Sequence, residues 1–155
     1  MRTLEDLVAA APLFAGLSDS HLALIAGCGE NERAAAGAYL FREGEPANRF
    51  YLIREGAIAL EIDAPGRGAL VIETLQDGDV VGWSWLFEPY RWQLDARVTQ
   101  AAALVSFDGQ CLRGKCEADH ELGYQLMRRF AASLVDRLQA TRLQLLDVYG
   151  HARAV

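Results

Sequence analysis

The sequence predicts a mainly β fold with flanking helices, a double-stranded β-helix (jelly roll), followed by one long C-terminal helix. Short segments in which apolar and polar residues alternate recur between about residues 39 and 107, and glycines separate them. After this region, a proline-free stretch with helical spacing runs to about residue 150. Seven or so short strands at that spacing are typical of a β-sandwich or barrel, of which the jelly roll is one version.

Ahead of the strands, the N-terminal region has the spacing of two short helices. Residues 3–10 and 18–27 carry apolar residues three and four apart, and Ser18 is a residue type that caps helix N-termini. Pro12 and Gly16 interrupt the chain between the two segments. We therefore expect two helices before the first strand.

One central segment shows the strand pattern clearly. In "AIALEI", Ile58, Leu60 and Ile62 fall on one face of a strand, and the alternate residues fall on the other. The next stretch, "DAPGRG" (Asp63 to Gly68), has the composition of a hairpin turn. The segments with strand pattern are "YLF", "RFYLIR", "AIALEI", "ALVIETL", "DVVG", "LDARV" and "ALVSF".

The C-terminal helix is predicted over about 30 residues, from His120 to Gly150, or some 45 Å, after a shorter segment "GQCLRGKCEAD". Some of its apolar residues recur at steps of three and four, like the a and d positions of a coiled coil. A second stripe contains Ala131, Val135 and Leu146. One stripe can pack on the β-domain and the other then needs a partner, so we expect a homodimer; the alternative is a helix that packs all its apolar surface on its own domain. The a/d set is Met127, Phe130, Leu134, Leu138, Thr141, Leu145 and Val148.

Composition limits the class of protein. With 155 residues, 52% of them hydrophobic and 23% charged, the chain reads as one ordered globular domain. The net charge of −6 argues against a nucleic-acid binder, although it does not exclude a small anionic ligand. The N-terminus lacks a signal-peptide pattern, no apolar run is long enough for a membrane span, and three cysteines do not make a disulfide framework. These features predict a cytoplasmic protein with no membrane contact.

The order of motifs resembles a known family. "LFREGEPANRFYLIREGAIAL" (Leu40 to Leu60) closely resembles the signature of cyclic-nucleotide-binding domains of the Crp/Fnr type, and "PLFAGLSDSHLALIA" is similar to their helical lead-in. "LQDGDVVG" (Leu75 to Gly82) is similar to the strand that enters their phosphate-binding cassette. The glycines of these motifs suit tight turns and close backbone approach, although turn glycines of an unrelated sandwich would look alike. These glycines are Gly44, Gly56, Gly78 and Gly82.

The resemblance implies a phosphate-binding cassette. In the family, a glycine is followed by a glutamate that binds the ribose, by a short helix whose amides face the phosphate, and by an arginine. Here Gly82 matches the glycine, Trp83 replaces the glutamate, and Ser84 to Phe87 are expected to form the short helix, with Leu86 at an apolar family position. The arginine has two candidates, Arg91 and Arg97. For Arg91 a surface role competes with the phosphate role, and the facing of Arg97 is open.

Replacement of the glutamate should weaken nucleotide binding. Trp83 cannot accept a hydrogen bond. A charge-assisted hydrogen bond contributes about 1.5–3 kcal/mol, so cyclic AMP affinity in the usual pose should fall roughly 10- to 100-fold. The cassette looks more like the Fnr-type branch than the cyclic-AMP branch. No cofactor is therefore firmly predicted, and cyclic AMP or cyclic GMP is expected to bind weakly at most.

All three tryptophans lie between Gly82 and Trp92. They either line an open pocket for a planar or apolar ligand, or collapse into the vacated nucleotide space. The first arrangement predicts a non-catalytic sensor that binds a small effector in the β-roll and signals through the C-helix dimer. The second predicts a dimeric interaction module that binds no nucleotide. The candidate site consists of Gly82, Trp83, Ser84, Trp85, Leu86, Arg91 and Trp92.

The resemblance also suggests a division of the chain. We expect a β-roll with its N-terminal helices over residues 1–116 and a dimerisation helix over residues 117–150. Regulators of this family continue into a helix-turn-helix domain, but here the sequence ends at "YGHARAV", too short for a three-helix DNA reader. Unless a C-terminal segment has been removed, the sequence predicts no DNA-binding domain and no direct contact with nucleic acid.

Other chemistry finds little support. The spacing of Cys111 and Cys116 is not typical of a zinc or iron–sulfur site, and Cys28 is distant in the sequence, in the N-terminal helix. We expect the cysteines to be small buried residues, with a Cys111–Cys116 redox pair as the alternative. His21 and His120 lie outside the strands, as does His151, so a metalloenzyme of the cupin kind is not predicted. No catalytic motif is present, and the sequence predicts no enzyme.

Overall fold

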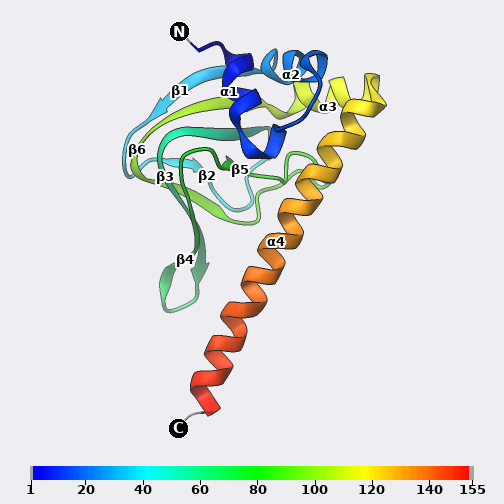
Figure 1. The fold of residues 1–155 in the computed structure, drawn as a ribbon. Helices are drawn as coiled ribbons and strands as arrows, with labels where there is room; N and C mark the ends of the chain where they lie inside the picture. The colour runs from blue at the N-terminus through cyan, green and yellow to red at the C-terminus, as the bar shows by residue number, and fades with distance from the viewer. Residues whose placement is uncertain (1, 154–155) are drawn as a thin grey trace.

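Two long antiparallel strands, β3 and β6, form the centre of the fold in a computed structural model that describes residues 2–153. Their pairing extends from Arg49↔Asp108 to Glu61↔Asp95, and the other strands attach to one or other of them. All pairings are antiparallel, and the sheet curls into a roll (Figure 1). The strands are β1 (Gly29–Ala34), β2 (Tyr39–Phe41), β3 (Arg49–Ala64), β4 (Gly68–Leu75), β5 (Val80–Val81) and β6 (Asp95–Asp108).

The predicted mainly β fold is confirmed, but the number of strands differs. "RFYLIR" and "AIALEI" belong to the single strand β3, and "LDARV" and "ALVSF" belong to β6. The expected hairpin turn is present, with the Arg67 amide donating to the Ala64 carbonyl at 3.0 Å. Strand β1 was not predicted because its sequence, "GENERA", is polar and mostly exposed, without an apolar alternation to signal it.

Gly56 allows β3 to run through a bend without ending. Its φ is +119°, and the pairing register with β6 shifts on both sides of it, between Glu55 and Ala57. A Cβ at this position would lie 2.8 Å from the Ala101 carbonyl oxygen and from the Ala102 Cα. The Gly56 amide donates to the Asp77 carboxylate at 3.0 Å. The strand therefore bends at a glycine, which tolerates the positive φ and has no side chain to collide with β6.

Three short helices cover one end of the roll. These are α1 (Leu4–Ala10), the 3₁₀ turn η1 (Pro12–Phe14) and α2 (Asp19–Ala26). Ser18 caps α2 as predicted, since its hydroxyl accepts from the His21 amide at 3.2 Å. Phe14 is fully buried and meets Phe107 of β6 edge-on at 6.3 Å. These helices thus extend the core of the sheet.

The C-terminal part begins with α3 (Gly109–Ala118) and continues as α4 (His120–Arg153). Helix α4 starts against the roll, runs past the β3–β4 hairpin and projects beyond it (Figure 1). Residues Leu138 to Gly150 are all exposed. Despite its length, α4 lacks a stretch apolar enough to span a membrane, as do the other helices within residues 2–153. The proposed boundary at residues 116/117 stays a prediction.

The predicted a/d set needs one correction, at Phe130. This ring is 3% exposed and lies edge-on to Phe50 (6.0 Å) and Trp85 (5.4 Å), so it belongs to the core of its own chain. From Leu138 onward the roll no longer covers the helix, and large apolar side chains face solvent both there and at some earlier positions of α4. Those exposed on α4 are Tyr124, Met127, Val135, Leu138, Leu143, Leu145, Leu146, Val148 and Tyr149.

The structure contradicts the expectation that the cysteines are simply small buried residues, and also the alternative of a Cys111–Cys116 pair. Cys28 lies just beyond the end of α2, and it forms a disulfide with Cys111 in the first turn of α3. A Cys111–Cys116 bridge does not form, because five residues of α-helix separate two Cα atoms by at least ~7.5 Å, beyond disulfide reach. Cys116 is a free, half-buried thiol.

We predict that Gly56→Ala lowers the free energy of unfolding by about 2–4 kcal/mol in urea denaturation, because the methyl group adds a clash to an unfavourable φ. Gly66→Ala is the matched control. Gly66 has a φ of +76° but no atom within 4 Å of the added Cβ, so only about 1 kcal/mol should be lost. Equal losses at the two positions would contradict the proposed role of the close approach at Gly56.

Candidate functional site

The segment from Gly82 to Trp92, called the cassette segment below, lies between β5 and β6. It forms two consecutive turns, in which the Leu86 amide donates to Trp83 (3.0 Å) and the Tyr90 amide to Phe87 (2.9 Å). The short helix expected at Ser84 to Phe87 is therefore absent from this segment. Without a helix N-terminus, the segment lacks the aligned amides that bind a phosphate in the family cassette.

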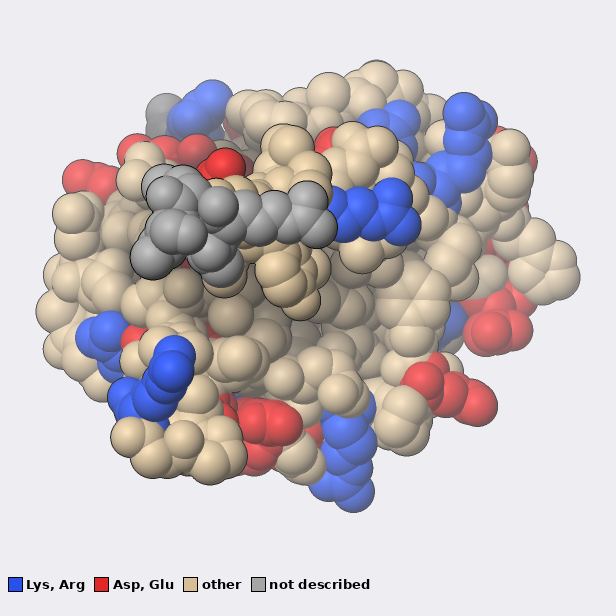
Figure 2. Space-filling view, turned by 90° about the horizontal axis from the view of Figure 1, so that it is seen from below, with Lys and Arg blue, Asp and Glu red and all other residues tan. Residues whose placement is uncertain are grey.

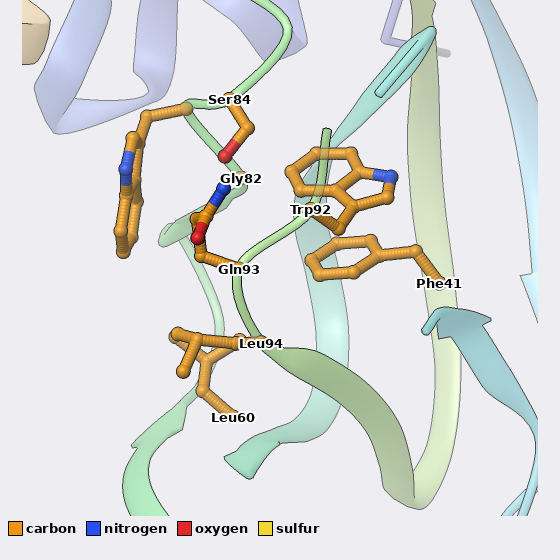
Figure 3. A pocket seen from close by; sticks show the side chains of 8 residues that line it. Phe41, Leu60, Gly82, Ser84, Trp92, Gln93 and Leu94 are labelled. Atoms are coloured by element: carbon orange, nitrogen blue, oxygen red, sulfur yellow. The ribbon is translucent and has the colours of Figure 1, made fainter. Parts of the chain in front are cut away.

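Trp92 closes the space above Gly82. Its indole stacks on the Phe41 ring with centroids 3.6 Å apart and planes 8° from parallel (Figure 3). Gly82 has a φ of +100°, and a Cβ there would lie 2.5 Å from Cη2 of Trp92. The indole thus rests directly on the glycine backbone, where any side chain would collide with it.

The backbone around Trp92 fixes this position. The Trp92 amide donates to Glu45 (3.0 Å), and its carbonyl accepts from the Gly44 amide (2.8 Å). The Ala47 amide donates to Tyr90 at 2.7 Å. The Gly44 turn of the family signature therefore holds the end of the cassette segment against β2 and β3.

The cavity that remains beside Gly82 is small. It offers about 10 Å³ to a water-sized sphere, which corresponds to about one water molecule. Between the tryptophan-lined pocket and the tryptophan-filled pocket, the geometry at this point favours the filled one. The lining residues are Phe41, Leu60, Gly82, Trp83, Ser84, Trp92, Gln93 and Leu94 (Figure 3).

Trp85 connects the segment to the core. It is fully buried, stacks on Phe50 (4.4 Å, 13°) and meets Phe130 of α4 edge-on. Arg113 of α3 donates to the Trp85 carbonyl and covers the Tyr90 ring at 4.2 Å. Both α3 and α4 therefore contact the cassette segment.

Trp83 lies on the opposite side of the segment, half-buried. The Arg137 guanidinium of α4 lies 4.7 Å from its ring centroid, and the same group is 3.5 Å from the Glu73 carboxylate of β4. Cation–π contact and ion pair together join α4, β4 and the cassette segment at one point. Sequence reasoning missed Arg137 because its partners lie 54 and 64 residues earlier in the chain.

Neither candidate arginine lines the small cavity. Arg91 is exposed and donates to the Gly44 carbonyl at 3.2 Å. Arg97 forms a two-bond ion pair with the buried Glu61 carboxylate, both distances 3.0 Å, and this partner raises the pKa of Arg97. Ser84 is buried and Leu86 packs against the core. Of the predicted site residues, the cavity brings together Gly82, Trp83, Ser84 and Trp92.

Sequence reasoning missed the other side of the cavity. Phe41 and Leu60 come from β2 and β3, and Gln93 and Leu94 directly follow the predicted segment. The last two could have been included simply by extending the segment to β6. Phe41 carried no signal of its own, because its contact with Trp92 depends on how β2 pairs with β6.

A much larger groove lies between α4 and the β4 edge of the roll. It offers about 840 Å³, and Trp83 and Leu94 form its inner end. Its charged lining has both signs, Arg129 and Arg137 against Glu73, Asp79 and Asp136. Figure 2 shows the face from which α4 projects, and neither sign gathers there into one patch. The groove therefore has room for a ligand but no marked preference for an anion.

Residues 2–153 contain no group of three or more histidine, cysteine, aspartate or glutamate side chains placed to hold a metal ion.

An antiparallel β-roll with N-terminal helices, a cassette crossing and a long C-terminal helix defines the class of cyclic-nucleotide-binding-like regulatory domains. The family model of the cyclic nucleotide-binding domain matches residues 31–119, more than half of the chain. The chain belongs to this family.

The most informative relatives are regulators and solved domains. The CRP-like cAMP-activated global transcriptional regulator of Mycobacterium tuberculosis is 26% identical over 145 residues, which cover 94% of this chain and 63% of the regulator. A crystal structure from Geobacter metallireducens GS-15, whose name gives it as a cyclic nucleotide-binding protein, matches with a TM-score of 0.78 and 30% identity. That match covers 89% of this chain and 99% of the other. The regulatory domain of Toxoplasma gondii PKA with cAMP shares the fold, with a TM-score of 0.73 and 16% identity. That match covers 86% of this chain and 49% of the other.

We predict that Trp92→Ala lowers the free energy of unfolding by about 3–5 kcal/mol in urea denaturation, because a stacked, buried indole is lost and leaves a cavity. Trp83→Ala is the control, since half of that side chain already faces the groove, and it should cost less than half as much. Similar losses for the two variants would contradict the central position of Trp92.

Proposed function

We propose that this chain is a non-catalytic regulatory module of the Crp-like type that pairs two copies through α4. In this proposal its cassette does not hold a cyclic nucleotide in the usual pose. The observation that carries the proposal is the exposed apolar face of α4 beyond the roll. The filled cassette supports the second part, because the space above Gly82 admits about one water molecule.

The exposed residues of α4 have the spacing of a pairing helix. Tyr124, Ala131, Leu138 and Leu145 are seven residues apart and all exposed. Leu138 and Leu145, both first expected at the interface, belong to this series. Met127, Leu134 and Thr141, expected there as well, each follow a member of the series by three positions. An unpaired helix with this many exposed leucines is unusual, because isolated monomers seldom present large apolar patches. A second copy of α4 is the partner that matches the repeat.

The groove beside Trp83 supports a second candidate function, the sensing of a small effector. Its volume of about 840 Å³ is in the range of ligand sites, and its wall includes both α4 and the cassette segment. An effector there would touch Arg137, which links α4 to β4 and Trp83. The mixed charge of the lining favours a neutral or zwitterionic ligand over a phosphate.

We also propose a division of the chain into a roll over residues 1–116 and a pairing helix over residues 117–150. The cytoplasmic location and the lack of direct nucleic-acid binding also stay predictions. The chain spans only about 63% of the length of the M. tuberculosis regulator. The proposal therefore does not include the activity of that whole regulator.

We predict a dimer by light scattering at micromolar concentration. Leu138→Glu should weaken the dimer at least about 100-fold, because it places a charge inside an apolar seam. Leu143→Glu is the matched control, since Leu143 is also exposed on α4 (64%, against 51% for Leu138) but is turned about 140° from Leu138. A monomeric wild-type protein at tens of micromolar, or equal effects of both variants, would contradict pairing through this face.

We predict that cyclic AMP and cyclic GMP cause no saturable change in tryptophan fluorescence at micromolar concentration. The missing carboxylate and the filled cassette both lower affinity. An effector of the groove would instead quench Trp83, and Trp83→Phe should remove that signal while Trp92→Phe keeps it. Submicromolar binding of either nucleotide would contradict the filled-cassette proposal; silence across a neutral-metabolite panel would argue against the sensor and leave the dimer module.

A further inference from the structure

We propose that Cys28 and Cys111 form a reversible redox site that clamps α3 to α2. The inference is independent of the proposed pairing and of any effector. It starts from the disulfide between the two residues, which are 83 positions apart in the sequence and whose Cα atoms are 5.8 Å apart. That separation is within the usual range for disulfides.

The backbone around the two cysteines holds them together without the sulfur–sulfur bond. The Asp108 amide donates to the Cys28 carbonyl at 2.8 Å. The Asp108 carboxylate in turn caps α3 by accepting from the Cys111 amide at 3.0 Å. One residue therefore contacts both cysteines, so the two thiols stay within bonding reach in the reduced protein. A disulfide in such a place can open and close without the fold being rebuilt.

The three cysteines are not equivalent in exposure and reactivity. Cys111 is half-buried and so within reach of a small reagent, whereas Cys28 is 8% exposed. Burial raises the pKa of the Cys116 thiol to about 11, and the neighbouring carboxylates of Glu117 and Asp119 add to the shift. Cys116 is therefore protonated at neutral pH and reacts slowly. It serves as an internal reference thiol rather than as a third member of the site.

The chemistry balances with ordinary reagents. Reduction by a dithiol transfers two electrons and two protons, gives two cysteine thiols, and leaves the dithiol as its own cyclic disulfide. Reoxidation by a hydroperoxide removes two electrons and two protons from the thiols, and yields the disulfide, an alcohol or water, and one further water.

The clamp matters because of what α3 touches. Arg113 of α3 holds the cassette segment through the Trp85 carbonyl and the Tyr90 ring. A Cβ at Gly123 of α4 would lie 3.2 Å from the Cys116 carbonyl oxygen, so α4 packs closely on α3. Reduction removes the covalent tie between α2 and α3.

The non-covalent contacts between α2 and the α3 region then remain, and two polar ones can be named besides the Asp108–Cys28 hydrogen bond. The Lys115 ammonium donates to the Leu24 carbonyl at 2.7 Å, and His21 lies 3.4 Å from the Asp119 carboxylate. We infer that α3 loosens on reduction and that the cassette segment and the start of α4 loosen with it.

The test uses the wild-type chain in both redox states. Thiols are counted by maleimide labelling of the denatured protein. Protein reduced with dithiothreitol and desalted should show three thiols, and protein reoxidised with hydrogen peroxide should show one. Peptide mapping of the reoxidised protein should link Cys28 to Cys111. On reduction, amide exchange in α3 should accelerate by about tenfold or more, and the Tm should fall by about 10 °C.

Variants separate the site from a general effect of reductant. Cys116→Ser should respond like the wild type, whereas Cys28→Ser and Cys111→Ser should match the reduced wild type and ignore dithiothreitol. If either of the latter fails to fold, the wild-type comparison alone decides. Three free thiols after peroxide treatment, a bridge that involves Cys116, or identical α3 exchange in the two states would overturn the proposal.

Discussion

The stack of Trp92 on Phe41 above Gly82 is the contact on which the rest of the candidate site depends. It joins β2 to the cassette segment and fills the space that the glycine leaves open. With the indole in place, the segment closes through hydrogen bonds to the Gly44 turn rather than around a ligand. The glycine that matches the family cassette, Gly82, is present here, and an aromatic ring packs closely against it.

The same segment is continuous with the core. Trp85 lies between Phe50 of β3 and Phe130 of α4, so aromatic rings link the cassette, the sheet and the first turns of the C-terminal helix. The Trp85 indole N–H has no hydrogen-bond partner although it is buried. The aromatic links nevertheless mean that a shift of the cassette segment is felt by α4 through packed side chains rather than through a loop.

Local patterns predicted the fold well and the contacts of the site poorly. Alternation, turn residues and the Ser18 cap identified the strands, the hairpin and α2, because these depend on neighbours a few residues away. They did not identify β1, whose polar sequence becomes a strand only by pairing with β6. They also missed the Cys28–Cys111 bond and the core position of Phe130. Each of these is settled by residues far apart in the sequence that the roll brings together.

At the cassette the sequence indicated which residues gather but not how they lie. Trp83, Trp85 and Trp92 are close in the chain, yet they face the groove, the core and the Phe41 ring, respectively.

The unbroken helix beyond Arg137 adds a mechanical consequence. Its last 16 residues extend over about 24 Å, so a tilt of about 10° at the base of this segment would move its far end by roughly 4 Å. That base lies next to the cluster of Arg137, Glu73 and Trp83.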